Sequence, residues 1–264
     1  GIAEQDMVSM AGGIARQGML PIVHSFACFL TPRANEQIYN NSTEKTKIIY
    51  IGTLAGLIPG GPGHSHQSVR DIACMSAMPG LTVIEPSCED EARMAIRWAV
   101  EENPGSTYIR FVNVPLELPY KLPLEYQFEK GRGACLRFEG GFAAIVAYGP
   151  VMLNQAVKAS DYLKEITNGN VRVPVFNLPW LNSIDSDWLC ETFRRFETVI
   201  VLDNHFVIGG LGERIASTFG QQRWKMPQVI TLGLKEIPAC GTNDEVLRYH
   251  GLDLSSIVNL IQHE

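Results

Sequence analysis

Short apolar runs rich in β-branched and aromatic residues alternate with stretches of helical periodicity along the first part of the chain. The runs predict strands at Pro21–Phe26, Lys47–Ile51, Leu81–Glu85 and Thr107–Phe111. Helices are expected at Met7–Arg16, Arg33–Tyr39, Ser68–Met78 and Cys88–Glu102. We expect Ser87 to cap the last helix, because three acidic residues follow in its first turn.

The alternation lapses between Asn113 and Gly133, where Pro115, Pro119 and Pro123 favour an interdomain linker. It then resumes, with strands expected at 142–147, 171–176, 198–203 and 228–232 and helices at 153–166, 186–196 and 211–219. Repeated β-α-β units with nearly continuous apolar strands predict parallel sheets covered by helices on both faces. The chain is therefore predicted to form two α/β domains, each an α/β/α sandwich around a mostly parallel sheet.

Composition narrows the class of protein. The chain has 264 residues, a net charge of −6 and no basic run, which argues against a nucleic-acid or membrane-surface partner. No apolar stretch reaches the roughly 18–20 residues that span a bilayer, and no signal peptide is visible. The sequence opens at Gly1 without Met, so we expect upstream residues to have been removed or to be missing. Scattered single cysteines, with no Cys-x-x-Cys pair, indicate reduced thiols in a cytoplasmic protein: Cys28, Cys74, Cys88, Cys135, Cys190 and Cys240.

Glu4 stands at the start of an otherwise small and apolar helical segment. One interpretation is a first-turn acid that complements the helix dipole. The other is a carboxyl group in an apolar cleft, whose pKa is raised by desolvation so that it donates a proton.

Aromatic residues follow the strand at Pro21–Phe26. The strand leads to Phe26 and Phe29 at its carboxyl end, the edge where open α/β sheets bind ligands. Ordinary core packing would explain either ring alone. With Arg33 just beyond, the two rings are predicted to form an aromatic platform with a polar rim.

A glycine- and proline-rich stretch between Gly56 and Ser68 predicts a loop that leads into a helix. Its glycines are expected to let a ligand approach the backbone closely. His64 and His66 project from this loop, and a His-x-His pair can bind zinc, but no third ligand is evident. Acid–base work or recognition of hydroxyl groups is the favoured role for both histidines.

A second glycine cluster, in Val207–Glu213, follows a predicted strand and opens a helix. It lacks the third glycine of a dinucleotide fingerprint and lies outside the first β-α-β unit. A tight turn with close helix packing explains it.

Taken together, these segments resemble the transketolase family of thiamine diphosphate enzymes. The resemblance is carried in order over nearly the whole chain by Gly-Ile-Ala-Glu-Gln-Asp-Met from Gly1, Ser25-Phe-Ala-Cys-Phe-Leu-Thr with Arg33-Ala-Asn-Glu-Gln-Ile, His66-Gln-Ser with Asp71-Ile-Ala and Pro79-Gly-Leu-Thr-Val, and Asp203-Asn-His with Gly209-Gly-Leu-Gly. It implies a pyrimidine-binding domain at 1–118 that lacks its first strand and helix, a linker at 119–132 and the family's C-terminal domain at 133–264.

The resemblance also implies roles for single residues. Glu4 matches the glutamate that hydrogen-bonds the ring nitrogen of the cofactor's aminopyrimidine, and Phe29, with Phe26 beside it, matches the aromatic residue that stacks on this ring. His66 matches the histidine that meets substrate hydroxyls, with His64 as a neighbouring substrate contact. In the family another domain holds the diphosphate and Mg²⁺ through a Gly-Asp-Gly motif. This sequence has none, so a separately encoded diphosphate-binding subunit is expected, in a heterodimer or heterotetramer.

Two departures from the family bear on the substrate. The acidic residue usual before the Thr-His-Gln element is missing, since glycine and proline stand at 60–62. The arginine that often grips a sugar phosphate reads Asn113, although Arg110 remains nearby as a candidate substrate contact.

The resemblance therefore implies a transketolase subunit that transfers a two-carbon ketol unit between sugars. The alternatives are a β-type subunit of a 2-oxoacid dehydrogenase, a deoxyxylulose-phosphate-synthase-like enzyme and a non-catalytic scaffold. The retention of Glu4, Phe29 and His66 together argues against the scaffold.

Overall fold

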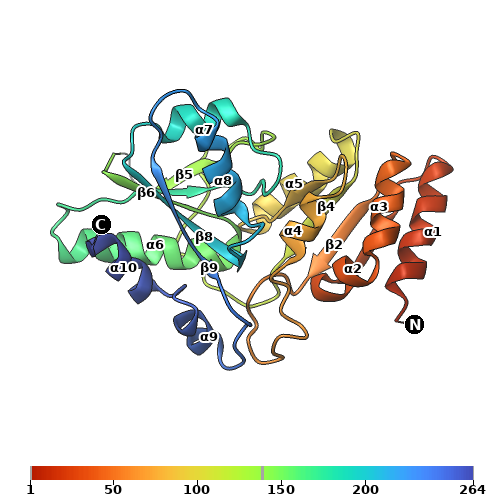
Figure 1. Cartoon of the computed structure of the whole chain (residues 1–264), viewed down its shortest axis with the longest axis horizontal. Coiled ribbons are helices and arrows are strands. Elements are labelled where there is room, and N and C mark those ends of the chain that lie inside the picture. The colour runs from red at the N-terminus through yellow and green to blue at the C-terminus, as the bar shows by residue number, and fades with distance from the viewer. Residues whose placement is uncertain (1, 138–139, 264) are drawn as a thin grey trace.

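The computed structural model describes residues 2–137 and 140–263, which form two sheets with flanking helices (Figure 1). The predicted α/β fold with two mostly parallel sheets is confirmed. No helix among the described residues is long and apolar enough to cross a bilayer.

The N-terminal half is built on four parallel strands in the order β1-β2-β4-β3. Helix α1 packs against β1 and α3, and α2 packs against β1, β2 and α4. Because β1 is an edge strand, its carboxyl end at Phe26 lies at one margin of the sheet. The elements are α1 (Glu4–Arg16), β1 (Ile22–Phe26), α2 (Ala27–Arg33), α3 (Asn35–Thr43), β2 (Ile49–Thr53), α4 (Asp71–Ser76), β3 (Thr82–Ile84), α5 (Glu89–Glu101) and β4 (Thr107–Phe111).

The described part of the C-terminal half has five strands in the order β5-β7-β6-β8-β9, of which only β5 runs antiparallel. In Figure 1, α7 and α8 lie on one side of this sheet and α6 and α10 on the other. The elements are β5 (Ala134–Arg137), β6 (Ala143–Ala147), α6 (Gly149–Ile166), β7 (Val175–Asn177), α7 (Ser186–Phe193), β8 (Thr198–Phe206), α8 (Leu211–Gly220), β9 (Gln228–Leu234), α9 (Asn243–Tyr249) and α10 (Leu254–His263).

Several helix boundaries differ from the prediction. The helix expected to begin at Arg33 is two helices, because α2 begins directly after β1 at Ala27 and the chain bends at Ala34. Ser87 does not cap α5. The N-cap is Cys88, which makes no side-chain capping bond, while the backbone N–H of Ser87 donates to the Glu91 carboxylate at 2.6 Å.

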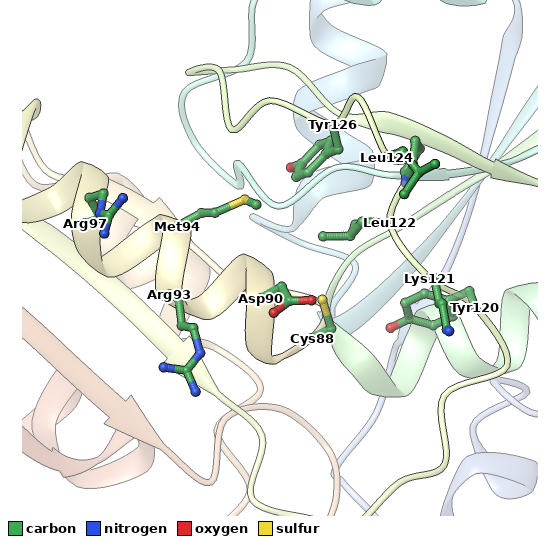
Figure 2. A pocket seen from close by; sticks show the side chains of 11 residues that line it. Cys88, Asp90, Arg93, Met94, Arg97, Tyr120, Lys121, Leu122, Leu124 and Tyr126 are labelled. Carbon is green, nitrogen blue, oxygen red and sulfur yellow. The ribbon is translucent and has the colours of Figure 1, made fainter.

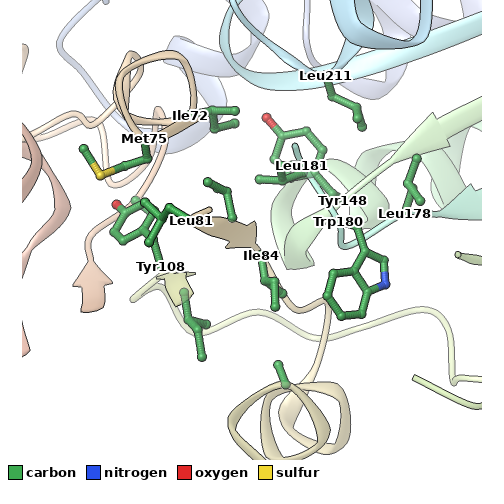
Figure 3. Close-up of a cluster of buried hydrophobic side chains, with 14 of the residues drawn as sticks. Ile72, Met75, Leu81, Ile84, Tyr108, Tyr148, Leu178, Trp180, Leu181 and Leu211 are labelled. Atoms are coloured by element: carbon green, nitrogen blue, oxygen red, sulfur yellow. The ribbon is translucent and has the colours of Figure 1, made fainter. Parts of the chain in front are cut away.

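A hydrophobic cluster contains buried residues of both halves (Figure 3). Ile72, Met75 and Ile84 of the N-terminal half are buried in the same cluster as Tyr148 and Trp180 of the C-terminal half. A backbone bridge between Ile84 and Trp180 continues the contact. Burial of this apolar surface stabilises the pair of halves as a unit.

Candidate active site

Glu4 is the first residue of α1, and its side chain is only 7% exposed. Ser25 Oγ donates a hydrogen bond to its carboxylate at 3.2 Å, and Arg33 Nη1 donates to both oxygens at 3.1 and 3.2 Å. Burial raises the pKa of Glu4, but the hydrogen bond from its own backbone N–H and the contacts with Arg33 and Ser25 together hold it below its usual value. The interpretation of Glu4 as a carboxyl group with a raised pKa is therefore wrong for the chain alone, because the backbone hydrogen bond, Arg33 and Ser25 together outweigh the effect of burial.

An aromatic cluster adjoins this ion pair at the carboxyl end of β1. The Phe26 and Phe29 ring centroids lie 5.8 Å apart, and the His66 ring lies 5.2 Å from Phe29 and 6.3 Å from Phe26. The Arg33 guanidinium stands 4.1 Å over the Phe29 ring. The structure thus brings Glu4, Phe26, Phe29 and His66 into one continuous set of contacts linked by Arg33, in which Phe29 is supplied by α2 rather than by the strand.

The loop that carries both histidines lies between β2 and α4. His64 is exposed, and His66 is half-buried with its Nδ1 2.9 Å from Ser65 Oγ. His64 also lines a cavity of about 410 Å³ between this loop, α2 and the segment after β9. No group of three potential metal ligands occurs within residues 2–137 and 140–263.

The glycines of this loop serve packing against the C-terminal half. A Cβ atom at Gly56 would lie 2.0 Å from Asn204 Nδ2, and one at Gly60 would lie 2.6 Å from Val246 Cγ2. The expectation that the glycines admit a ligand is therefore wrong at these two positions, because protein atoms already fill the space.

Arg110 does not reach the candidate site. It is fully buried, with Nε donating to Asp71 at 2.8 Å and Nη1 paired with Glu85. Its Nη2 donates to Ser68 O at 3.2 Å and to Asn204 O at 3.4 Å. The predicted role in substrate binding is thus corrected to a structural one. The sequence around Arg110 does not predict this structural role, because the partners of Arg110 come from segments distant in the sequence.

The glycine cluster at Val207–Glu213 is a tight turn into α8, as its interpretation predicts. The backbone N–H groups of Leu211 and Gly212 donate to the buried Asp203 carboxylate at 3.0 and 2.8 Å. A Cβ atom at Gly212 would lie 2.1 Å from Thr231 Oγ1, which explains the glycine there by close helix–strand packing.

A larger cavity, of about 720 Å³, lies between α5 and the segment at 120–126 (Figure 2). Arg93, Arg97 and Lys121 contribute positive charge to its lining, and Met94 and Leu122 contribute apolar surface. None of the predicted site residues lines it.

Comparison with known proteins gives two family matches that together cover most of the chain. Residues 1–113 match the transketolase pyrimidine-binding domain, and residues 134–257 match the transketolase C-terminal domain.

Among single relatives, a protein of Methanocaldococcus jannaschii named as the C-terminal section of a transketolase is 32% identical over 100% of this chain and 81% of its own length. One of the subunits of the apulose-4-phosphate transketolase of Actinobacillus succinogenes is 30% identical over 98% of this chain and 82% of its own length. The chain spans only 40% of the 1-deoxy-D-xylulose-5-phosphate synthase of Clostridium tetani, to which it is 29% identical.

A solved structure described as a split-gene transketolase in an inactive β4 tetramer superposes with a TM-score of 0.86 at 30% identity. The superposition covers 99% of this chain and 81% of the chain of that structure. With the family models, the relatives and the fold in agreement, the chain belongs to the transketolase family of transferases and is similar to the C-terminal subunits of its split members.

Proposed function

We propose that the chain is the pyrimidine-binding subunit of a two-subunit transketolase, which transfers a two-carbon ketol unit between sugars. A separately encoded subunit would hold the diphosphate and Mg²⁺ of thiamine diphosphate. The observation that carries the proposal is the buried Glu4 carboxylate, joined through Arg33 to the Phe29 ring and through it to the exposed Phe26. The absence of a Gly-Asp-Gly motif from the sequence supports the need for a partner.

The residues at the site fit the aminopyrimidine of the cofactor. The Arg33 guanidinium stacks 4.1 Å over Phe29, so this ring face already accepts a flat group with positive charge. Phe26 is 38% exposed, which leaves a second aromatic face for contact. When bound, thiamine diphosphate supplies the nucleophile that cleaves a carbon–carbon bond next to a ketone.

Glu4 would hold a proton toward the pyrimidine ring nitrogen. In the chain alone, Arg33 keeps the carboxyl ionised. If the Arg33 guanidinium were displaced from Phe29, the Glu4 carboxylate would lose its ion pair and more of its water. Both changes would raise the pKa of Glu4, so that it would hold a proton in the filled site.

His64 and His66 are proposed to contact the hydroxyl groups of the sugar from the loop between β2 and α4. No basic residue lies between Thr53 and Gly63, and the second position after β4 is the exposed Asn113. A sugar phosphate normally requires Arg or Lys. We therefore propose that the sugar is a neutral polyol, or that its phosphate is held by the partner.

The domain boundaries at 118 and 133 and a cytoplasmic location are also part of the proposal. Cys28, Cys74, Cys88, Cys190 and Cys240 form no disulfide, which agrees with a reducing compartment. A deoxyxylulose-phosphate-synthase-like reaction is the second candidate, because one such synthase matches 98% of the chain. Product analysis with a ketose or with pyruvate as the donor separates the two reactions.

The test uses Glu4→Gln in the full chain, assembled with the separately encoded diphosphate-binding subunit. Because an amide cannot exchange the proton, turnover should fall roughly 10²–10⁴-fold. Asp6→Asn, an exposed first-turn acid of the same helix, is the matched control and should keep the rate. The chain without its partner should show weak cofactor binding by calorimetry and no turnover. More than about a tenth of the wild-type rate in Glu4→Gln, or full turnover by the chain alone, would contradict the proposal.

A further inference from the structure

The histidine loop, residues 54–67, is hydrogen-bonded to the C-terminal half at several points. The backbone N–H of Leu57 donates to Asn204 Oδ1 at 2.8 Å, and that of Gly60 donates to Asn243 Oδ1 at 3.0 Å. Gln67 Nε2 donates both to Leu57 O within the loop and to Ala239 O beyond it, each at 2.9 Å. Both ends of the loop are thus tied to the C-terminal half, at the end of β8 and after β9.

The apolar side chains of the loop belong to the core of the C-terminal half. Leu57 is 0% exposed and Ile58 is 2% exposed, and both lie in the hydrophobic cluster that contains Val151, Leu234 and Val246. Burying side chains of this size contributes a large share of the free energy that orders a segment. The loop therefore folds against the C-terminal half, although its sequence position assigns it to the N-terminal half.

The backbone of the loop at Gly60 also lies very close to the C-terminal half. Beyond the clash with Val246 described above, a Cβ atom at Gly60 would lie 3.0 Å from Gly241 O, whereas one at the adjacent Gly61 would meet nothing within 4 Å. Neither residue has the left-handed backbone that would itself disfavour alanine. The pair thus offers one substitution that separates the loop from the C-terminal half and one that does not.

We propose that the C-terminal half positions His64 and His66 for sugar recognition, with Asn204 and Asn243 as positioning residues that act through the loop backbone. The inference rests on the proposed function for the role of the histidines. His66 contacts Phe29 across the candidate site, so a shift of the loop changes the place where a sugar hydroxyl is met. Glu4 and Arg33 make no hydrogen bond to the loop among the described residues, so their own hydrogen bonds do not depend on it directly.

The experiment compares Gly60→Ala with Gly61→Ala in the full chain, alone and assembled with its partner subunit. In the chain alone, the imidazole ¹⁵N resonances of His66 are recorded by NMR and assigned with a His66→Gln variant. In the assembled enzyme, kcat and KM for the donor ketose are measured. Gly60→Ala should move the His66 resonances and lower kcat/KM about 10–100-fold, mainly through KM, since small displacements of binding groups have effects of this size. Gly61→Ala should change neither.

Two further variants guard against a simple folding defect. Gly60→Ala with Val246→Ala removes the nearest atom that the new Cβ meets but leaves Gly241 O in place, so it should restore part of the lost kcat/KM and move the His66 resonances part of the way back. Asn243→Ala deletes the bond to Gly60 without adding atoms and should act in the same direction as Gly60→Ala, with the exposed Asn259→Ala as its control.

The inference is overturned if Gly60→Ala and Asn243→Ala leave the His66 resonances in place, whatever happens to the rate, or if Gly61→Ala has the same effect as Gly60→Ala. Moved resonances support it even where the assembled wild-type enzyme transfers no ketol group. An assembled wild-type enzyme that transfers no ketol group would contradict the proposed function but not the positioning of the loop.

Discussion

Glu85 is a fully buried carboxyl group whose two oxygens have very different surroundings. It forms an ion pair with Arg110, while its Oε1 has no hydrogen-bond partner among the described residues. A Cβ atom at Gly149, the first residue of α6, would lie only 1.8 Å from this oxygen, so nothing further fits beside it. Burial raises the pKa of Glu85 to about 7, since Arg110 opposes the rise but Asp71 and Asp203 add to it.

Because of this raised pKa, the free energy of unfolding changes with pH in one direction. The usual glutamate value is 4.5, so the folded chain binds the proton more tightly than the unfolded chain does. The free energy of unfolding therefore falls as the pH rises through the window between these two values. With a folded value of about 7, the linkage relation gives a loss of about 2.5 kcal/mol between pH 5 and pH 8.

Glu85→Gln removes the titration and keeps the shape and an oxygen for Arg110. Urea unfolding of the full chain, followed by tryptophan fluorescence, measures the free energy of unfolding of both proteins at pH 5, 6, 7 and 8. The stability of the variant relative to the wild type should rise by about 2.5 kcal/mol across this range. Changes at every other titrating group cancel to first order in the difference.

An ionised Glu85 predicts a different result for the same variant. If Glu85 stays ionised on Arg110 throughout, Glu85→Gln breaks a buried ion pair and destabilises the chain by roughly 3–5 kcal/mol at every pH. A difference that is flat, or that falls with pH, would refute the reasoning. Glu245→Gln is a control of opposite sign, because the capping bonds from Thr242 lower the pKa of the exposed Glu245, and its stabilising effect is lost as the pH falls.

Two further predictions concern the candidate site. Arg33→Gln should raise the pKa of Glu4 in the chain alone, which ¹³C NMR of the carboxyl carbon measures. It should also reduce the part of the free energy of unfolding that Glu4 contributes above pH 4.5 and that is lost as the pH falls. An unchanged titration of Glu4 would contradict its pairing with Arg33. Asn113→Arg should raise kcat/KM of the assembled enzyme for a phosphorylated ketose such as xylulose 5-phosphate. A wild-type value already at or above about 10⁴ M⁻¹s⁻¹ would contradict the substrate proposal unless the partner supplies an arginine to the phosphate.

The parallel strands were predictable because fully buried strands leave continuous apolar runs in a sequence. Every parallel strand of the described residues was expected from such a run, with shifts of a few residues at the ends. The antiparallel β5 was not expected. It is a short, half-buried edge strand of four residues directly after the linker, and so has no such run. Helices α9 and α10 were also not expected, although Thr242 and Glu245 form a capping box at the start of α9.

The candidate site was predictable only in part, for a physical reason. Glu4, Phe26, Phe29 and His66 lie in short motifs, so their residue types carried the information. The partner of Glu4 did not follow from them, because Arg33 lies on a helix whose start at Ala27 the periodicity missed. Arg110 could not be distinguished from a solvent-facing arginine, since its burial depends on Asn204 and on the packing of the C-terminal half.

The position of the C-terminal half also explains why the candidate site is confined to one margin of the first sheet. Open α/β sheets bind ligands at the carboxyl ends of their strands. At β4 and β3 the C-terminal half covers part of these ends, because Arg110 and Glu85 are buried as an ion pair and Arg110 donates to Asn204 O. The loop after β2 is held against the same half through Leu57 and Gly60. The end of β1, at Phe26, is 38% exposed beside Ser25 and Glu4, which is where the candidate site lies.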